Sequence, residues 1–143
     1  MNYNVALQMD FIKNNLLLIA VAFASGAMLL WPFVRRTAGG PWVSTLQATQ
    51  MINREDALVL DVREPAEFAK GHILGARNVP LGDFERRAAE LDKHKAKPVI
   101  VTCDSGSRAT RVIEGLKTRG FARVVNLSGG YGAWQQAGLP VEK

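Results

Sequence analysis

The chain has 143 residues, of which 48% are hydrophobic and 22% charged, which suits one globular domain with an appendage. The formal net charge is +5, but from residue 40 onward 15 lysines and arginines face 12 aspartates and glutamates, too small a surplus to indicate a nucleic-acid partner. The single cysteine excludes an internal disulfide framework, and no cluster of cysteine and histidine predicts a metal site.

An uncharged apolar stretch dominates the N-terminal part, after a short mixed tail. Residues 16–34 contain no charge over 19 positions. At about 1.5 Å per residue, a helix of this length just crosses a hydrocarbon core of about 30 Å. Trp31 and Phe33 lie near its end, where interfacial aromatic side chains are typical. We therefore expect residues 1–36 to be a tail and a single-pass transmembrane helix that contacts lipid through residues 16–34.

Two alternatives to an anchor stay open. Ala22-Phe23-Ala24 has the small-x-small form of a signal-peptide cleavage site, although the apolar run continues for ten residues beyond it. A buried helix of a soluble domain would have a similar composition, but nothing later in the chain requires one. An uncleaved anchor is the interpretation that these observations favour.

Charges that flank the apolar stretch predict its orientation. Arg35 and Arg36 follow it at once, whereas Lys13 before it is offset by Asp10. The tendency of positive residues to stay inside then favours a cytoplasmic C-terminal domain. Residues 37–41, with the sequence TAGGP, are expected to form a flexible linker, and the domain is expected to span residues 42–143.

Within the domain, apolar runs of strand length alternate with helical patterns. Ser44 followed by Gln47 predicts a capping box and a helix to about residue 53. Strands are expected over residues 57–62, 77–79, 98–102 and 123–127, and further helices over residues 65–70, 83–91, 109–116 and 131–136. Apolar strands separated by helices predict an α/β fold with a parallel sheet covered on both faces. Such sheets bind ligands at the carboxyl ends of their strands.

The strand over residues 98–102 runs into a loop with the composition of an anion site. Cys103, Asp104, Ser105, Gly106, Ser107 and Arg108 lead from this strand directly into the next helix. Backbone N–H groups in a small-residue loop before a helix bind anions, and arginine adds a permanent forked cation. A lone cysteine is commonly a small buried apolar residue. At the start of such a loop, however, we expect Cys103 to be a stabilised thiolate and a nucleophile, with Asp104 opposing that effect.

Three ordered motifs resemble those of rhodanese (sulfurtransferase) domains. The pattern Cys103-x-x-Gly106-x-Arg108 is similar to the active-site loop of that family. Residues 61–80, DVREPAEFAKGHILGARNVP, resemble its N-terminal signature, and residues 127–141, LSGGYGAWQQAGLPV, resemble its C-terminal one. Together the motifs span about residues 43–141. The resemblance implies a five-stranded parallel sheet flanked by helices.

The resemblance also implies sulfane-sulfur transfer without a cofactor. Cys103 would attack a small anionic donor such as thiosulfate, or a protein persulfide, and form its own persulfide. A thiol acceptor would then take the outer sulfur, while residues 104–108 would hold the donor. Related cysteine phosphatases and arsenate reductases carry one more residue between cysteine and arginine, whereas four residues separate them here. A membrane-tethered interaction module with little turnover is the alternative from another class.

Other residues near the motifs are expected to support the site. Asp61 and Arg63 are expected to form an ion pair that fixes the loop under the active site. His72 is expected to be a structural hydrogen-bonding residue, because attack by an ionised thiolate needs no strong base. His94 is expected at a solvated helix end, and the glycines at positions 129, 130 and 132 are expected to serve turns.

Overall fold

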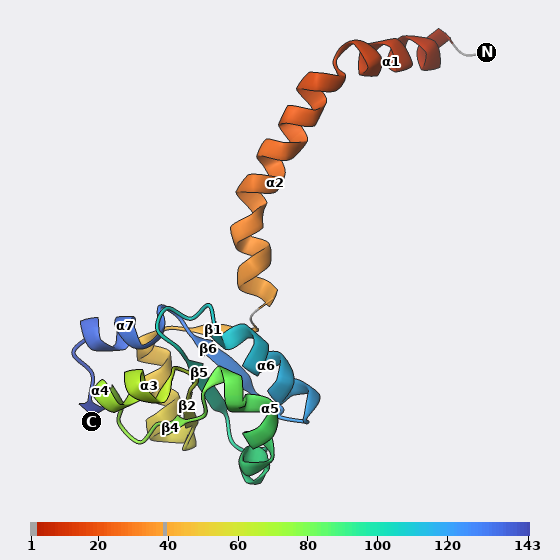
Figure 1. The fold of residues 1–143 in the computed structure, drawn as a ribbon. Helices are drawn as coiled ribbons and strands as arrows, with labels where there is room; N and C mark the ends of the chain where they lie inside the picture. The colour runs from red at the N-terminus through yellow and green to blue at the C-terminus, as the bar shows by residue number, and fades with distance from the viewer. Residues whose placement is uncertain (1–2, 39) are drawn as a thin grey trace. The chain divides into compact units, whose positions relative to one another are not determined.

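The computed structural model describes residues 3–38 and 40–143, with the side chains of residues 7–34 and 40–143. The chain forms two compact units, Met1–Arg35 and Arg36–Lys143 (Figure 1).

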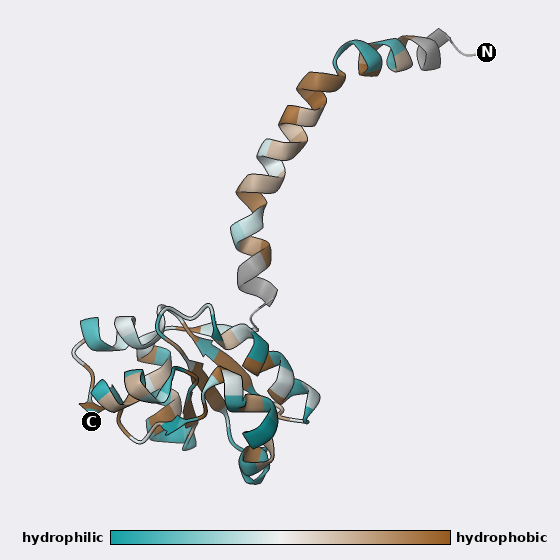
Figure 2. Ribbon diagram, viewed as in Figure 1, coloured by the Kyte–Doolittle hydropathy of each residue, from teal (hydrophilic) through white to brown (hydrophobic). Residues whose placement is uncertain are grey.

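The first unit is helical. It contains α1 (Tyr3–Asn14), where the sequence predicted only a mixed tail, and most of α2 (Leu16–Ala38). Within α2, the span Leu16–Val34 is long and apolar enough to cross a membrane, and no residue of that window is buried. Figure 2 shows the apolar colouring along α2. A signal sequence near an N-terminus would have the same properties.

Some expectations about the junction fall on residues outside the description. Helix α2 continues to Ala38, so the first two residues of the expected linker over residues 37–41 are helical. Residue 39 lies outside the described residues, and so do the side chains of Arg35 and Arg36, on which the expected orientation depends.

The second unit is built on a five-stranded parallel sheet, which confirms the predicted fold class. The strands lie in the order β1 (Trp42–Val43), β6 (Val124–Leu127), β5 (Val99–Thr102), β2 (Leu58–Asp61), β4 (Arg77–Asn78). β5 lies in the centre, and its Val101 is opposite Leu60 on one side and Asn126 on the other. Every residue of β5 and β6 is buried. Strands buried on both faces explain the continuous apolar runs in the sequence.

Helices cover both faces of the sheet, as Figure 1 shows. On one face α6 (Ala109–Thr118) and α5 (Phe84–Arg87) pack over side chains that include Leu60 and Val101. On the other face α3 (Thr45–Glu55) and α7 (Gly130–Gln136) pack over side chains that include Val59, Ile100 and Val125. The alternation of side chains along each strand thus divides the core into two clusters.

Local signals gave most helix boundaries. α3 begins with the predicted capping box, since Gln47 N donates to Ser44 Oγ at 3.2 Å and Ser44 N donates to Gln47 Oε1 at 2.9 Å. Helix α4 (Pro65–Lys70) has the predicted bounds.

The segment predicted as one helix over residues 83–91 is instead divided. It comprises the short three-ten helix η1 (Leu81–Asp83), then α5, then the three-ten helix η2 (Ala88–His94). Phe84, Ala88 and Leu91 are buried, so the apolar spacing was read correctly. Side chains three residues apart lie on one face in a three-ten helix as well as in an α-helix. The apolar spacing alone therefore could not distinguish between the two kinds of helix.

A second, two-stranded sheet was not predicted. β3 (His72–Ile73) pairs with β7 (Val141–Glu142) in antiparallel register, with His72 opposite Glu142. Strands of two residues carry no periodicity from which they could be recognised. The pairing brings the last residues of the chain to the segment that follows α4.

Candidate active site

Cys103 lies at the carboxyl end of the central strand β5, where the sheet topology places a ligand site. Its side chain is fully buried and belongs to the core cluster that also contains Val101 and Ala109. A buried cysteine is the usual structural case, but this sulfur also has a polar partner. The amide of Gly106 donates a hydrogen bond to Cys103 Sγ at 2.9 Å. The loop therefore closes back on its own first residue.

Gly106 has to be glycine for this closure. Its φ is +94°, and a Cβ at this position would lie 2.8 Å from the ring of Trp42 and 3.2 Å from the carbonyl oxygen of Leu127. A side chain would therefore be strained by the backbone conformation and would also collide with β1. The family motif's requirement for glycine has a steric cause in this chain.

A second segment, at the start of α7, holds the other side of the loop. Tyr131 N donates to Cys103 O at 2.8 Å, and Gly132 N donates to Asp104 O at 3.3 Å. A Cβ at Gly130, whose φ is +57°, would lie only 2.3 Å from Cys103 O. The glycines predicted as turn residues thus have a further role, because they let α7 approach the loop and pair its carbonyl groups.

Asn126 was not predicted as a site residue. It is fully buried on β6, and its Nδ2 donates to Gly106 O at 2.9 Å. Within the described residues, its Oδ1 is buried without a hydrogen-bond partner. A polar residue within the buried strand sequence VVNL was the signal that could have identified it.

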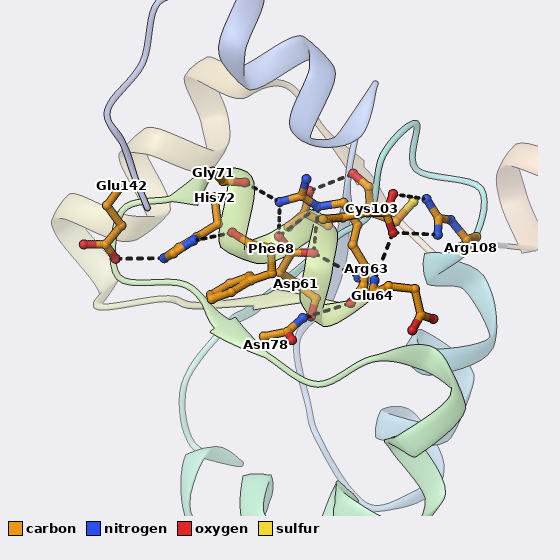
Figure 3. A network of polar contacts seen from close by, with 12 residues as sticks. Asp61, Arg63, Glu64, Phe68, Gly71, His72, Asn78, Cys103, Arg108 and Glu142 are labelled. Atoms are coloured by element: carbon orange, nitrogen blue, oxygen red, sulfur yellow. Dashed lines mark hydrogen bonds and ion pairs between the residues drawn. The ribbon is translucent and has the colours of Figure 1, made fainter.

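Arg108 was predicted to hold an anionic donor, but in this structure it is bound by a carboxylate. Its Nη1 and Nη2 lie 3.3 Å from Glu67 Oε2 and Oε1 respectively (Figure 3). The hydrogen bonds that Arg108 donates to this carboxylate raise the pKa of Arg108. Desolvation opposes this rise, and the negative charges of Glu67, Cys103 and Asp104 add to it. The same hydrogen bonds, followed by one from the Glu64 amide, lower the pKa of Glu67. Glu67 is part of the quoted signature, but its partner could not be deduced from sequence.

The remaining loop residues predicted to bind the donor face solvent. Asp104, Ser105 and Ser107 are exposed, and the hydroxyls of Ser105 and Ser107 lie 3.3 Å apart. A cleft of about 280 Å³ opens beside the loop. Its lining includes Arg63, Glu67, Lys70, Asp104, Tyr131 and Gln135.

The ion pair expected between Asp61 and Arg63 is present and buried. Arg63 Nη2 lies 2.7 Å from Asp61 Oδ2, and the two side chains are 5% and 0% exposed. Arg63 also donates to Gly71 O at 2.8 Å and stacks over the ring of Tyr131, with Cζ 4.1 Å from the ring centroid. The pair therefore ties the end of β2 to the end of α4 and to the start of α7. These contacts fix the segments that surround the loop (Figure 3).

His72 lies on β3 and points away from Cys103 (Figure 3). Its Nδ1 lies 2.9 Å from Phe68 O, its Nε2 lies 3.3 Å from Glu142 Oε1, and its ring stacks on Phe68. Figure 3 shows His72 directed toward Glu142, on the opposite side of the network from Arg108. His94, predicted at a solvated helix end, is half-buried, with Nε2 3.4 Å from Arg77 Nη1. Within the part of the chain that the structure describes, neither imidazole forms a hydrogen bond with Cys103.

Comparisons with known proteins agree with this geometry. Residues 44–137 match the family described as "Rhodanese-like domain". The Escherichia coli (strain K12) protein YibN is 37% identical over 116 residues, which are 80% of this chain and 81% of that protein. The thiosulfate sulfurtransferase GlpE of Actinobacillus pleuropneumoniae is 32% identical over 100 residues, 70% of this chain and 91% of that protein.

Solved structures give the same result. The crystal structure of a rhodanese-related protein from Thermoplasma volcanium superposes with a TM-score of 0.64 at 28% identity, covering 71% of this chain and 97% of that one. The family match covers well over half of the chain and includes β2, the Cys103 loop and all of α7. The chain therefore belongs to the rhodanese-like domain family.

Proposed function

We propose that the protein is a sulfurtransferase that carries sulfane sulfur as a persulfide on Cys103. The observation that carries the proposal is the hydrogen bond from the Gly106 amide to Cys103 Sγ, within a loop at the carboxyl end of the central strand. A fixed donor aimed at the sulfur can stabilise negative charge there, both on the attacking thiolate and on the persulfide that it becomes. Relatives named as sulfurtransferases support the same chemistry.

The reaction proceeds in two balanced displacements. The Cys103 thiolate attacks the outer sulfur of thiosulfate, and a sulfur–sulfur bond forms as the bond to the sulfonate group breaks, its electron pair leaving with sulfite. An acceptor thiolate then attacks the outer sulfur of the persulfide and forms a new sulfur–sulfur bond. The bond between this sulfur and Cys103 Sγ breaks, and its electron pair stays on Cys103 as the regenerated thiolate. No external oxidant, reductant or general base is needed. A protein persulfide can replace thiosulfate as the donor in the first step.

Intact-mass measurement tests the proposal on the full chain in a neutral detergent. After incubation with thiosulfate, the wild-type protein should gain the mass of one sulfur atom and should convert cyanide to thiocyanate. Cys103→Ser should do neither, yet retain its fold by circular dichroism, because a serine hydroxyl fits the same volume but is not ionised at neutral pH. Substantial turnover by Cys103→Ser would show that the nucleophile lies elsewhere.

One observation favours a second candidate, a tethered interaction module with little turnover. Cys103 has no exposed surface, so a donor reaches its sulfur only after the loop surroundings move. The same measurement separates the two functions. A module would show no added sulfur with thiosulfate or with a persulfide donor, whereas a carrier for a dedicated partner would be loaded but turn over slowly.

The N-terminal unit supports a further proposal about location. The span Leu16–Val34 anchors the protein as a single transmembrane helix in contact with lipid, and the rhodanese-like domain faces the cytoplasm. The support is the length and apolar character of the span, together with the flanking charges at Arg35 and Arg36.

A further inference from the structure

The cation of the Cys103 loop already has an anionic partner within the protein. The two terminal nitrogens of Arg108 each lie 3.3 Å from one oxygen of Glu67. A guanidinium binds carboxylate, phosphate and other oxyanions through this same paired arrangement of donors. Glu67 therefore occupies the donors that an external anion at this loop would use.

The Glu67 carboxylate is held in place by its own helix. It is the third residue of α4, and its Oε2 accepts a hydrogen bond from the Glu64 amide at 3.0 Å, as part of a capping box. An anion that displaces Arg108 from Glu67 leaves this cap intact. The Arg108 and Glu67 side chains are 40% and 36% exposed, so an anion from solution can reach the pair. The contact is thus open to competition.

Charges around the cleft give no net attraction for a dianion. Arg63, Lys70, Glu67 and Asp104 line the cleft, and Arg108 belongs to the loop. Asp61 does not line the cleft, but it is buried in an ion pair with Arg63, so that among these described residues three cations are balanced by three carboxylates. The lowered pKa of Glu67 and the raised pKa of Arg108 keep both members of their pair charged at neutral pH. A thiolate at Cys103 would add a further negative charge.

Taking the proposed sulfur transfer as given, we infer that Glu67 determines donor specificity by competing with anionic donors for Arg108. Thiosulfate carries two negative charges and has to displace Glu67 to gain the guanidinium. A persulfide on a protein thiol carries at most one charge and needs the guanidinium less. The site therefore favours weakly charged persulfide donors over small dianions.

Alkylation of Cys103 tests this inference without requiring sulfur transfer. Cys103 is the only cysteine in the chain, so the reaction rate reports this site alone. Iodoacetate and iodoacetamide both alkylate a thiolate by displacement of iodide, but iodoacetate carries one negative charge and iodoacetamide none. Dividing the iodoacetate rate by the iodoacetamide rate therefore removes the effect of how often the buried sulfur becomes accessible. Glu67→Gln removes the charge and keeps an oxygen for the Glu64 amide. The full chain in a neutral detergent is the sample.

In Glu67→Gln, the ratio of the iodoacetate rate to the iodoacetamide rate should rise roughly two- to five-fold at low salt, and less at high salt, as for a partly exposed ion pair. Glu90→Gln is the matched control, because it removes the carboxylate on η2 that pairs with Arg87 at the end of α5, in a partly exposed ion pair. This control should leave the ratio unchanged. An equal ratio in wild type and Glu67→Gln would overturn the inference.

A donor comparison supplies the second measurement. Benzenethiosulfonate transfers its outer sulfur as thiosulfate does but carries one negative charge instead of two. Glu67→Gln should raise kcat/KM for thiosulfate relative to benzenethiosulfonate by a similar factor. An unchanged ratio would count against the competing role of Glu67. If wild-type Cys103 took sulfur from neither donor and from no persulfide donor, the proposed function would fail, while the alkylation ratio would still decide the role of Glu67.

Discussion

The side-chain amide of Asn126 donates to the carbonyl oxygen of Gly106, and the amide of the same Gly106 donates to Cys103 Sγ. Asn126 thus fixes the carbonyl group of the residue whose N–H group points at the sulfur. Asn126 is buried on β6, a strand without exposed residues. Its hydrogen bond therefore attaches the loop to a rigid part of the sheet. Asn126 is therefore a positioning residue for the loop.

Asn126→Leu should therefore impair sulfur transfer more than stability. Loss of the bond to Gly106 O leaves a buried acceptor unpaired and should lower the free energy of unfolding by about 1–3 kcal/mol. The rate of persulfide formation on Cys103 should fall at saturating thiosulfate, because the Gly106 amide is no longer fixed. Asn53→Leu, an exposed change on α3, is the control. A normal rate in a destabilised Asn126→Leu protein would restrict the residue to a structural role.

Charge in the loop should govern the use of thiosulfate. Arg108→Ala should lower kcat/KM for thiosulfate by about 10- to 150-fold, the effect of losing one charge-assisted hydrogen bond of roughly 1.5–3 kcal/mol, and Arg108→Lys should recover part of it. Asp104→Ala should lower the thiosulfate KM, most clearly at low ionic strength. Arg111→Ala, exposed on α6, is the matched control. A normal KM in the Arg108 and Asp104 variants would mean that charge here does not govern donor binding.

The buried pair of Asp61 and Arg63 should dominate the stability of the segments around the site. Arg63→Met leaves the carboxyl group of Asp61 fully buried and without its partner, and should lower the free energy of unfolding by about 3–5 kcal/mol in urea titration. The double variant Asp61→Val with Arg63→Met should recover much of this loss. Arg123→Met breaks an exposed pair with Glu55 and should change stability little. A small effect of Arg63→Met alone would contradict the assigned importance of the pair.

His94 should make the domain less stable in mild acid. Desolvation, followed by the nearby charges of Arg77, Lys93 and Lys97, lowers the pKa of His94, with Asp56 opposing them. Because the folded state binds this proton more weakly than the unfolded state, stability falls as the pH decreases below the unfolded pKa of about 6.5, and this contribution levels off below the folded pKa. His94→Asn should flatten the dependence of Tm on pH over this window. An identical Tm profile in the variant would refute the linkage.

The proposed orientation makes the location testable in cells. A C-terminal reporter that is active only in the cytoplasm should function when fused to the full chain, because Arg35 and Arg36 favour the cytoplasmic side. Recovery of a soluble periplasmic form that begins near Ser25 would instead establish cleavage after Ala24. Membrane fractionation with an alkaline wash is the accompanying control.

The sequence predicted the elements whose signals are local. The capping box at Ser44 and the apolar runs of β2, β5 and β6 gave their positions, because burial on both faces leaves a plain pattern. The ion pair of Asp61 and Arg63 was predictable because its members lie only two positions apart in the sequence. By contrast, Arg108 and Glu67 lie 41 residues apart, and only the folded chain brings α4 beside the loop. Asn126 acts through a contact 20 residues back along the chain, so its role also depended on tertiary structure.

The burial of α4 and of β5 differs completely. Every residue of β5 is buried between two neighbouring strands, while α4 has six residues and buries none. Local opening begins where few apolar contacts hold a segment, so α4 moves before β5 does. Cys103 thus follows a rigid strand, whereas Glu67, the partner of Arg108, belongs to a helix that is held less firmly. We therefore expect access to Cys103 Sγ to depend on movement of α4. Substitutions in α4 could then change how fast, or with which molecules, the sulfur reacts, without any change in the strand that precedes Cys103.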